Sequence, residues 1–193
     1  MIIVKLFLLI GYFYLIKSKT VFMHNLPLGE YRTIFEKMYS CPSTDLIKFN
    51  TYFSKTASNI TVIKGNISLL IPFDDILSID INAASWSLIG GWKPNSIVYL
   101  SKNACNSLKK IAGKAWYSII KAFNIPTTSC PLPSGTYITS GLDLKELEDN
   151  HNFPKVYFYG KYKFTFKIKS VKNKVVFCSI LELSLIRPWE KPI

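Results

Sequence analysis

The most regular pattern in the chain is an alternation of apolar and basic or polar side chains over residues 157–169. Successive side chains of a strand point to opposite sides, so each set falls on one face of an extended segment. The apolar set is Tyr162, Phe164, Phe166 and Ile168, and the other set is Lys161, Lys163, Thr165, Lys167 and Lys169. The pattern predicts a strand with one basic face and one aromatic face that needs a covering layer.

Further strands follow from similar patterns elsewhere. Residues 77–83 alternate between aliphatic and polar side chains and predict a half-buried strand. Apolar and β-branched runs predict additional strands, which are expected within 21–40 and over 46–53, 61–73, 97–100 and 175–186.

The segments between these strands carry turn signals. Residues 86–95 hold two glycines and two tryptophans and predict an exposed loop, and residues 143–150 predict a polar loop with a helical turn. The chain contains no internal repeat and no low-complexity linker. Many short strands separated by turns predict one all-β domain, an antiparallel β-sandwich.

One segment changes period. Over residues 103–123 apolar side chains recur at intervals of three and four with lysines between them, which predicts an amphipathic helix inserted in the sandwich. Ser101 or Asn103 is expected to cap it, and it should end before Pro126. A helix packed on a sheet accounts for this pattern, and so does a helix that touches a membrane with its lysines at the rim.

The first residues have the anatomy of a secretory signal peptide. A short basic start ending at Lys5 precedes an apolar run from Leu6 to Ile16, and the small polar residues Ser18 and Thr20 follow. The run is too short to span a bilayer, and a retained signal anchor is the alternative. We therefore expect a signal peptide over residues 1–18 and a single domain over residues 19–193. The protein is expected to be extracellular, with the lysosomal or endosomal lumen as another location.

The charge of the chain is strongly basic, with Lys+Arg 24 against Asp+Glu 12 and a formal net charge of +12. Such a surface suits nucleic acid or anionic lipid headgroups, and a solvated basic face without a partner is the third interpretation. Secretion argues against a nucleic-acid partner. An anionic membrane surface is therefore the better candidate.

The cysteines and sequons agree with an extracellular protein. Four cysteines, Cys41, Cys105, Cys130 and Cys178, allow three disulfide pairings, and their spacing matches no zinc site. Asn59 and Asn66 each begin an acceptor sequon for N-glycosylation.

Catalytic chemistry is sparse in this sequence. His151 near Asp149 resembles an acid–base pair, but a solvated loop histidine explains it better, and Asp74 and Asp75 are expected to mark a turn. No nucleophile elbow and no phosphate-binding glycine loop is found. We expect no enzyme activity, no cofactor and no metal; an enzyme would have to use His151 or Asp74.

The aromatic content of 15% is high for a single sandwich. Aromatic side chains usually form core. A sandwich whose sheets splay can instead hold an apolar ligand, and each buried CH₂ of that ligand contributes about 0.8 kcal/mol. Composition allows both a filled and a hollow sandwich.

Short motifs carry a family resemblance. Cys130-Pro131-x-x-x-Gly135-Thr136-Tyr137 is followed by Gly160-Lys161-Tyr162 and Val176-Phe177-Cys178, and Asn103-Ala104-Cys105 opens the helical segment. In these motifs, over about residues 41–186, the chain resembles the ganglioside-activator branch of the ML lipid-recognition family. The resemblance implies an immunoglobulin-like β-sandwich, an apolar cavity between its sheets, secretion and non-catalytic lipid binding. It also implies the disulfides Cys41–Cys178 and Cys105–Cys130.

Two hypotheses follow. The first is a secreted protein that holds a lipid or other apolar ligand between two sheets and extracts or presents it at a membrane, with Trp86 and Trp92 touching the membrane. The expected lipid-binding residues are Trp116, Ile120, Phe123, Tyr162, Phe164, Phe166 and Ile168. The second is a secreted ligand or co-receptor with a filled core and a protein partner.

Overall fold

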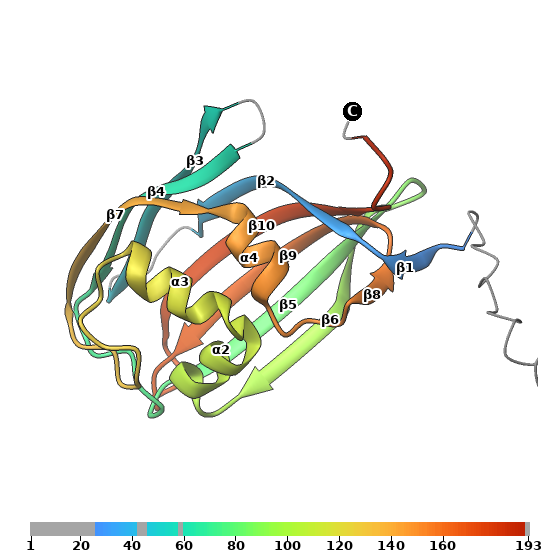
Figure 1. The fold of residues 1–193 in the computed structure, drawn as a ribbon. Helices are drawn as coiled ribbons and strands as arrows, with labels where there is room; N and C mark the ends of the chain where they lie inside the picture. Colours follow the sequence, from blue (N-terminus) through green and yellow to red (C-terminus); the bar gives the residue numbers. More distant parts are fainter. Residues whose placement is uncertain (1–25, 42–45, 58–59, 192–193) are drawn as a thin grey trace, which may run out of the picture.

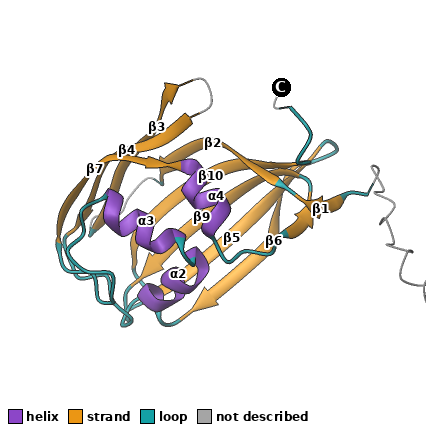
Figure 2. Ribbon diagram, viewed as in Figure 1, coloured by secondary structure: helices purple, strands orange, loops and turns teal. Residues whose placement is uncertain are grey.

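The computed structural model describes residues 26–41, 46–57 and 60–191. The predicted signal peptide and the sequon asparagine Asn59 lie outside these residues. The described chain is mostly β, with ten strands in three antiparallel sheets and three short helices (Figures 1 and 2). The prediction of an all-β sandwich is therefore confirmed.

The larger sheet has five strands in the order β2-β10-β9-β5-β6. Its strands are β2 (Arg32–Ser40), β5 (Ser78–Ser87), β6 (Gly91–Ser101), β9 (Gly160–Lys169) and β10 (Val175–Ile186). The strand predicted over 157–169 is β9 together with the short β8 (Val156–Phe158). Tyr162, Phe164 and Ile168 are buried and Phe166 is half-buried, so the aromatic face of β9 points toward the core as the alternation predicts.

The second layer of the sandwich is a three-stranded sheet. It contains β3 (Ile47–Ala57), β4 (Ile60–Leu69) and β7 (Gly135–Asp143) in the order β3-β4-β7. A small separate sheet joins β1 (Leu28–Glu30) to β8. Buried aliphatic side chains of both large sheets belong to one core cluster, which places the core between the two layers.

The helix predicted over 103–123 is two helices, α2 (Ala104–Ala112) and α3 (Ala115–Ala122). The break falls at Gly113, which adopts a φ of 60°. A Cβ there would lie 2.8 Å from Asn152 Oδ1 and 2.9 Å from the carbonyl oxygen of Asn150, so the close approach of this later segment requires glycine. Apolar periodicity continues across the break, which is why the sequence predicted one helix.

The predicted cap of α2 is also different. Asn103 is the N-cap residue, but its side chain makes no capping hydrogen bond. The carboxylate of Asp75 accepts a hydrogen bond from the backbone N–H of Asn106 at 2.9 Å and a second from the Asn106 side chain. A carboxylate at a helix N-terminus is favoured by the helix dipole. The third helix, α4 (Leu144–Asn150), lies where a helical turn was expected and is capped by Asp143.

The loop predicted over 86–95 is mostly strand. Trp86 is in β5 and Trp92 is in β6, and they pair directly across the hairpin with ring centroids 5.2 Å apart. Cross-strand aromatic contact extends the strands to the Trp–Trp pair. Only Leu88–Gly90 form the turn, so the turn is much shorter than the loop that the glycines predict.

Two disulfides join Cys41 to Cys178 and Cys105 to Cys130. These are the pairs that the family resemblance implies. The first links the end of β2 to β10, and the second links α2 to the segment that leads into β7.

Candidate functional site

The candidate site is an apolar pocket of about 470 Å³ on the inner face of the five-stranded sheet. The floor comes from β9 and β10 with contributions from β2 and β6, and the opposite wall comes from the helices and the segment 151–157. The residues that line it are Tyr31, Thr33, Phe35, Ser96, Ile97, Val98, Ala112, Ala115, Ile119, Leu147, His151, Phe153, Pro154, Tyr157, Phe164, Phe166, Leu181, Leu183 and Leu185.

The wall opposite the five-stranded sheet is helical. None of the lining residues belongs to β3, β4 or β7. The pocket therefore lies between a sheet and a helical layer, whereas the family resemblance implied a cavity between two sheets. The three short helices lie over the part of the five-stranded sheet that forms the floor of the pocket (Figure 2).

Two of the seven residues expected to bind lipid line this pocket, namely Phe164 and Phe166. The others belong to the core. Trp116, Ile120, Phe123 and Ile168 are buried, and the indole N–H of Trp116 donates to the Thr128 carbonyl oxygen at 2.9 Å. Tyr162 is also buried, and this burial, with a smaller effect of Tyr157, raises its pKa to about 12.

Sequence reasoning missed most of the lining residues. The alanines and Ile119 of the two helices belonged to the predicted helix, but period alone cannot tell which apolar positions face a space. The alternation of Leu181, Leu183 and Leu185 along β10 places them on one face of the strand, and this is the signal that could have identified them as lining residues.

His151 occupies the edge of the pocket because the preceding helix and a backbone contact fix it there. Asn152 donates its backbone N–H to the Ile111 carbonyl oxygen at 2.9 Å and its side-chain N–H to the Lys110 carbonyl oxygen at 2.8 Å. These bonds attach the segment to the end of α2, beside Gly113. Burial, reinforced by the nearby charge of Lys155, lowers the pKa of His151.

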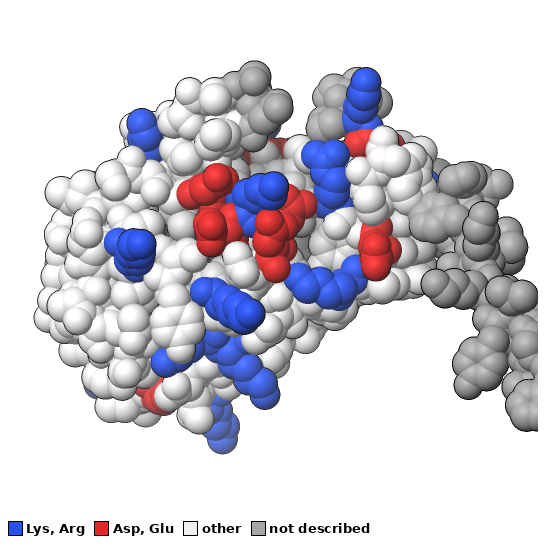
Figure 3. Space-filling view, viewed as in Figure 1, with Lys and Arg blue, Asp and Glu red and all other residues white. Residues whose placement is uncertain are grey.

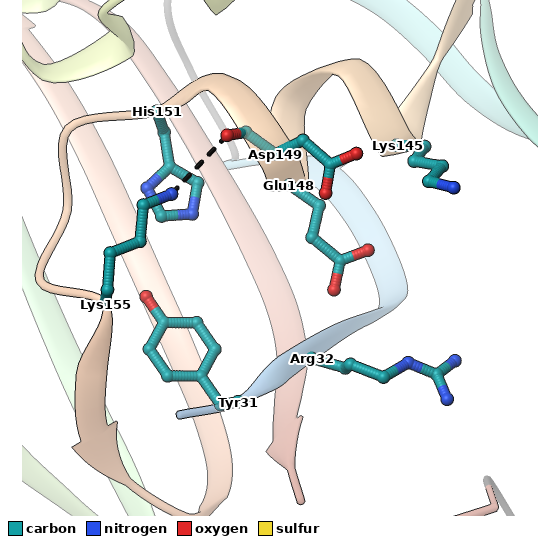
Figure 4. A pocket seen from close by; sticks show the side chains of 7 residues that line it. All are labelled: Tyr31, Arg32, Lys145, Glu148, Asp149, His151 and Lys155. Carbon is teal, nitrogen blue, oxygen red and sulfur yellow. Dashed lines mark hydrogen bonds between the residues drawn. The ribbon is translucent and has the colours of Figure 1, made fainter. Parts of the chain in front are cut away.

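A second, charged pocket of about 400 Å³ adjoins the apolar one (Figure 4). Tyr31 and His151 line both pockets, which makes them the junction. The remaining lining residues of the charged pocket are Arg32, Lys145, Glu148, Asp149 and Lys155. Figure 3 shows acidic and basic side chains gathered over the region of α4 on this face of the molecule.

Among the described residues, three lysines on the outer face of the five-stranded sheet have carboxylate partners, unlike the cations of the charged pocket. On that outer face, Lys161 pairs with Glu36, Lys163 with Glu182 at 3.2 Å, and Lys169 with Asp80 at 2.8 Å. Burial raises the pKa of Glu182, but hydrogen bonds from Lys163 and Tyr39 outweigh it and lower the pKa overall. Within the described ranges, no ion pair joins Arg32, Lys145 or Lys155 to a carboxylate.

The tryptophan hairpin projects an apolar tip. Leu88 and Ile89 are each 96% exposed, and Trp86 is about half exposed. The ammonium of Lys163 lies 4.3 Å from the centre of the Trp92 ring, a cation–π contact. Apolar side chains this exposed contribute little to folding, so they are available to an apolar partner.

The residues considered for catalysis serve local structure. Asp74 accepts a hydrogen bond from the backbone N–H of Ile76 at 3.1 Å, as expected for a turn. The His151 ring accepts the Phe153 backbone N–H and contacts the Phe153 ring edge-on.

The sequon asparagine Asn66 is half-buried in β4, where its side-chain oxygen accepts a hydrogen bond from Asn50 at 3.3 Å.

Comparison with known protein families gives a match to part of the chain. Residues 79–164 match the sequence model of a family described as a protein of unknown function (DUF1091). The matched segment runs from β5 to the middle of β9 and includes all three helices and the segment 151–157, which form the helical wall of the pocket. No curated protein matches the chain. In the part of the chain that the structure describes, no helix is both long and apolar enough to cross a membrane.

Proposed function

We propose that this chain is a secreted, non-catalytic lipid-binding protein that holds the apolar part of an amphiphile in the pocket between the five-stranded sheet and the helices. The observation that carries the proposal is the pocket itself, about 470 Å³ with almost wholly aliphatic and aromatic lining. Its volume falls in the range of about 300–1,000 Å³ that is typical of small-molecule sites.

The energetics of such a site need no special polar chemistry. Each buried CH₂ contributes about 0.8 kcal/mol, so ten of them contribute about 8 kcal/mol before the entropy lost on association is subtracted. That gross gain is enough for a useful affinity. The charged pocket next to it gives the polar end of an amphiphile a place close to solvent.

Several features support the rest of the proposal. Two disulfides are typical of proteins that fold in an oxidising compartment, which favours secretion and therefore glycosylation at the sequons. The resemblance to the ganglioside-activator branch of the ML family favours lipid cargo, glycolipid included.

The exposed tip of the tryptophan hairpin supports contact with a membrane surface. Leu88 and Ile89 would enter the lipid, and Trp86 with its partner Trp92 would lie at the interface, where aromatic side chains are favoured. The pair Leu88→Ser and Ile89→Ser should reduce flotation with anionic vesicles severalfold. Val171→Ser, at an exposed turn elsewhere, is the control and should have no effect; equal flotation of all variants would refute membrane contact by this tip.

Native mass spectrometry of the purified protein, before and after organic extraction, tests lipid binding. A bound mass that disappears on extraction and returns when lipid is added is the expected result. A protein that stays empty when fatty acids, sterols and glycolipids are offered would favour the protein-partner alternative.

A matched pair of variants localises the ligand. Ala112 lines the pocket, whereas Ala122 packs against the core without lining it, and both are half-buried helical alanines. Ala112→Phe should therefore reduce lipid uptake at least about tenfold by occupying the space. Ala122→Phe should leave uptake intact, and thermal melting of both variants checks that each is folded.

A further inference from the structure

We infer that the ligand carries an anionic head, held at the junction of the two pockets by the ammonium of Lys155 and the Nε2–H of His151. This inference rests on the proposed function and deepens it by assigning the class of ligand. It concerns a single-chain amphiphile with a carboxylate or phosphate head whose tail lies in the apolar pocket.

The first observation is a hydrogen bond that indicates the tautomer of His151. Its Nδ1 accepts the backbone N–H of Phe153 at 3.0 Å, so in the neutral imidazole the proton is on Nε2. Nε2 makes no hydrogen bond within the described part of the chain. A histidine that lines both pockets thus has a spare donor at the point where a tail would become a head.

The second observation is the neighbouring cation. Lys155 and His151 both line the charged pocket (Figure 4), and the charge of Lys155 is near enough to lower the pKa of the imidazole. Its hydrogen bond goes to the backbone carbonyl oxygen of Asp149 at 3.5 Å, which is long, and no carboxylate pairs with it in the described ranges. The ammonium of Lys155 and the Nε2–H of His151, next to the apolar pocket, form a small anion-binding site that can make charge-assisted hydrogen bonds.

The carboxylates of the charged pocket allow a competing hypothesis, in which the head of the ligand is cationic. One oxygen of Glu148 accepts the backbone N–H of Thr33 at 2.5 Å and is therefore engaged with β2. Asp149 also lies near His151 and acts on its pKa in the opposite direction to Lys155. An amphiphile with an ammonium head would use these two carboxylates, so the test must separate the two signs of charge.

Three probes with the same tail separate them, namely laurate, lauryl alcohol and laurylamine. Displacement of a fluorescent apolar dye from delipidated full-length protein, at neutral pH and below micelle formation, gives their affinities. Laurate should bind at least about tenfold more tightly than the alcohol, which is the usual effect of one charged hydrogen bond. Lys155→Gln and His151→Phe should remove most of this preference by weakening the binding of laurate more than the binding of the alcohol.

Controls make each outcome decisive. Lys145→Gln removes the same charge from the charged pocket but from α4, away from the junction, and should keep the preference. His151→Gln, which restores a donor, should recover part of it. Equal binding of laurate and the alcohol, or tighter binding of the amine, would overturn the anionic head yet keep lipid binding. Failure of all three probes to bind, together with native mass spectra that show no bound fatty acid, sterol or glycolipid, would overturn the proposed function itself.

Discussion

The two ends of one sheet face differ in what covers them. At one end, Phe177 of β10 contacts Phe49 of β3 with ring centroids 4.5 Å apart, and Ile168 beside it is buried in the same core. Further along the same two strands, beginning at the next inward-facing position of β9, Phe166 and Leu183 line a pocket. The first end is covered by a sheet and is filled, and the second is covered by short helices and is hollow.

The difference shows that a uniform strand pattern can serve both packing and binding. Side chains of two aligned sheets interdigitate along their whole length. The helical layer cannot do this, because α2 and α3 are broken at Gly113 and their lining residues include the small side chains of Ala112 and Ala115. Small residues on a covering helix leave the space that large ones would fill.

The largest effect should come from the filled end. Phe177→Ala removes a buried ring from a packed contact, and we expect it to lower the free energy of unfolding by about 3–5 kcal/mol. The shift of the urea midpoint measures it. A loss below about 1 kcal/mol would contradict the description of this end as filled.

The equivalent change at the hollow end should be smaller. Phe166→Ala removes a half-buried ring that already faces a pocket, so we expect a loss of about 1–2 kcal/mol, together with weaker lipid uptake. Urea unfolding and native mass spectrometry measure the two effects. If Phe166→Ala destabilises the fold as much as Phe177→Ala, the two ends do not differ in packing.

The smallest effect should appear with pH at the junction. The folded protein binds a proton at His151 less readily than the unfolded chain, because burial lowers its pKa below the usual 6.5. Neutral His151 therefore contributes its full stability above pH 6.5, and this contribution is lost as the pH falls through the lowered pKa. The difference between the urea midpoints at about pH 7.5 and about pH 5.5 should be smaller for His151→Gln than for the parent protein.

Periodicity predicted a large part of the fold. The alternation over residues 157–169 gave the buried face of β9, and β10 has the predicted bounds of 175–186. The errors fall where a distant segment decides the local structure. Asn150 and Asn152 approach Gly113 closely at the break between α2 and α3, and Trp86 and Trp92 contact each other across a hairpin where a loop was predicted.

The candidate site was harder to predict, since lining a space and filling a core need the same residues. Phe164 and Phe166 face the pocket while Trp116 and Phe123 are packed, although all four were expected to bind lipid. The sequence did not predict the junction of the two pockets at His151. That junction forms only because Lys155, Tyr31 and the end of α2 come together there in the fold.

The sequence by itself determined which strand faces are apolar, since period two fixes the side of each residue, and it supplied the four cysteines that pair. Only the tertiary structure decided that helices rather than a second sheet cover one end of the five-stranded sheet. It also decided that Lys161, Lys163 and Lys169 of β9 pair with acidic neighbours, whereas Lys155 pairs with no carboxylate in the described part of the chain. The physical reason is that packing gaps and charge pairing depend on side chains brought together from distant parts of the chain, which no local pattern specifies.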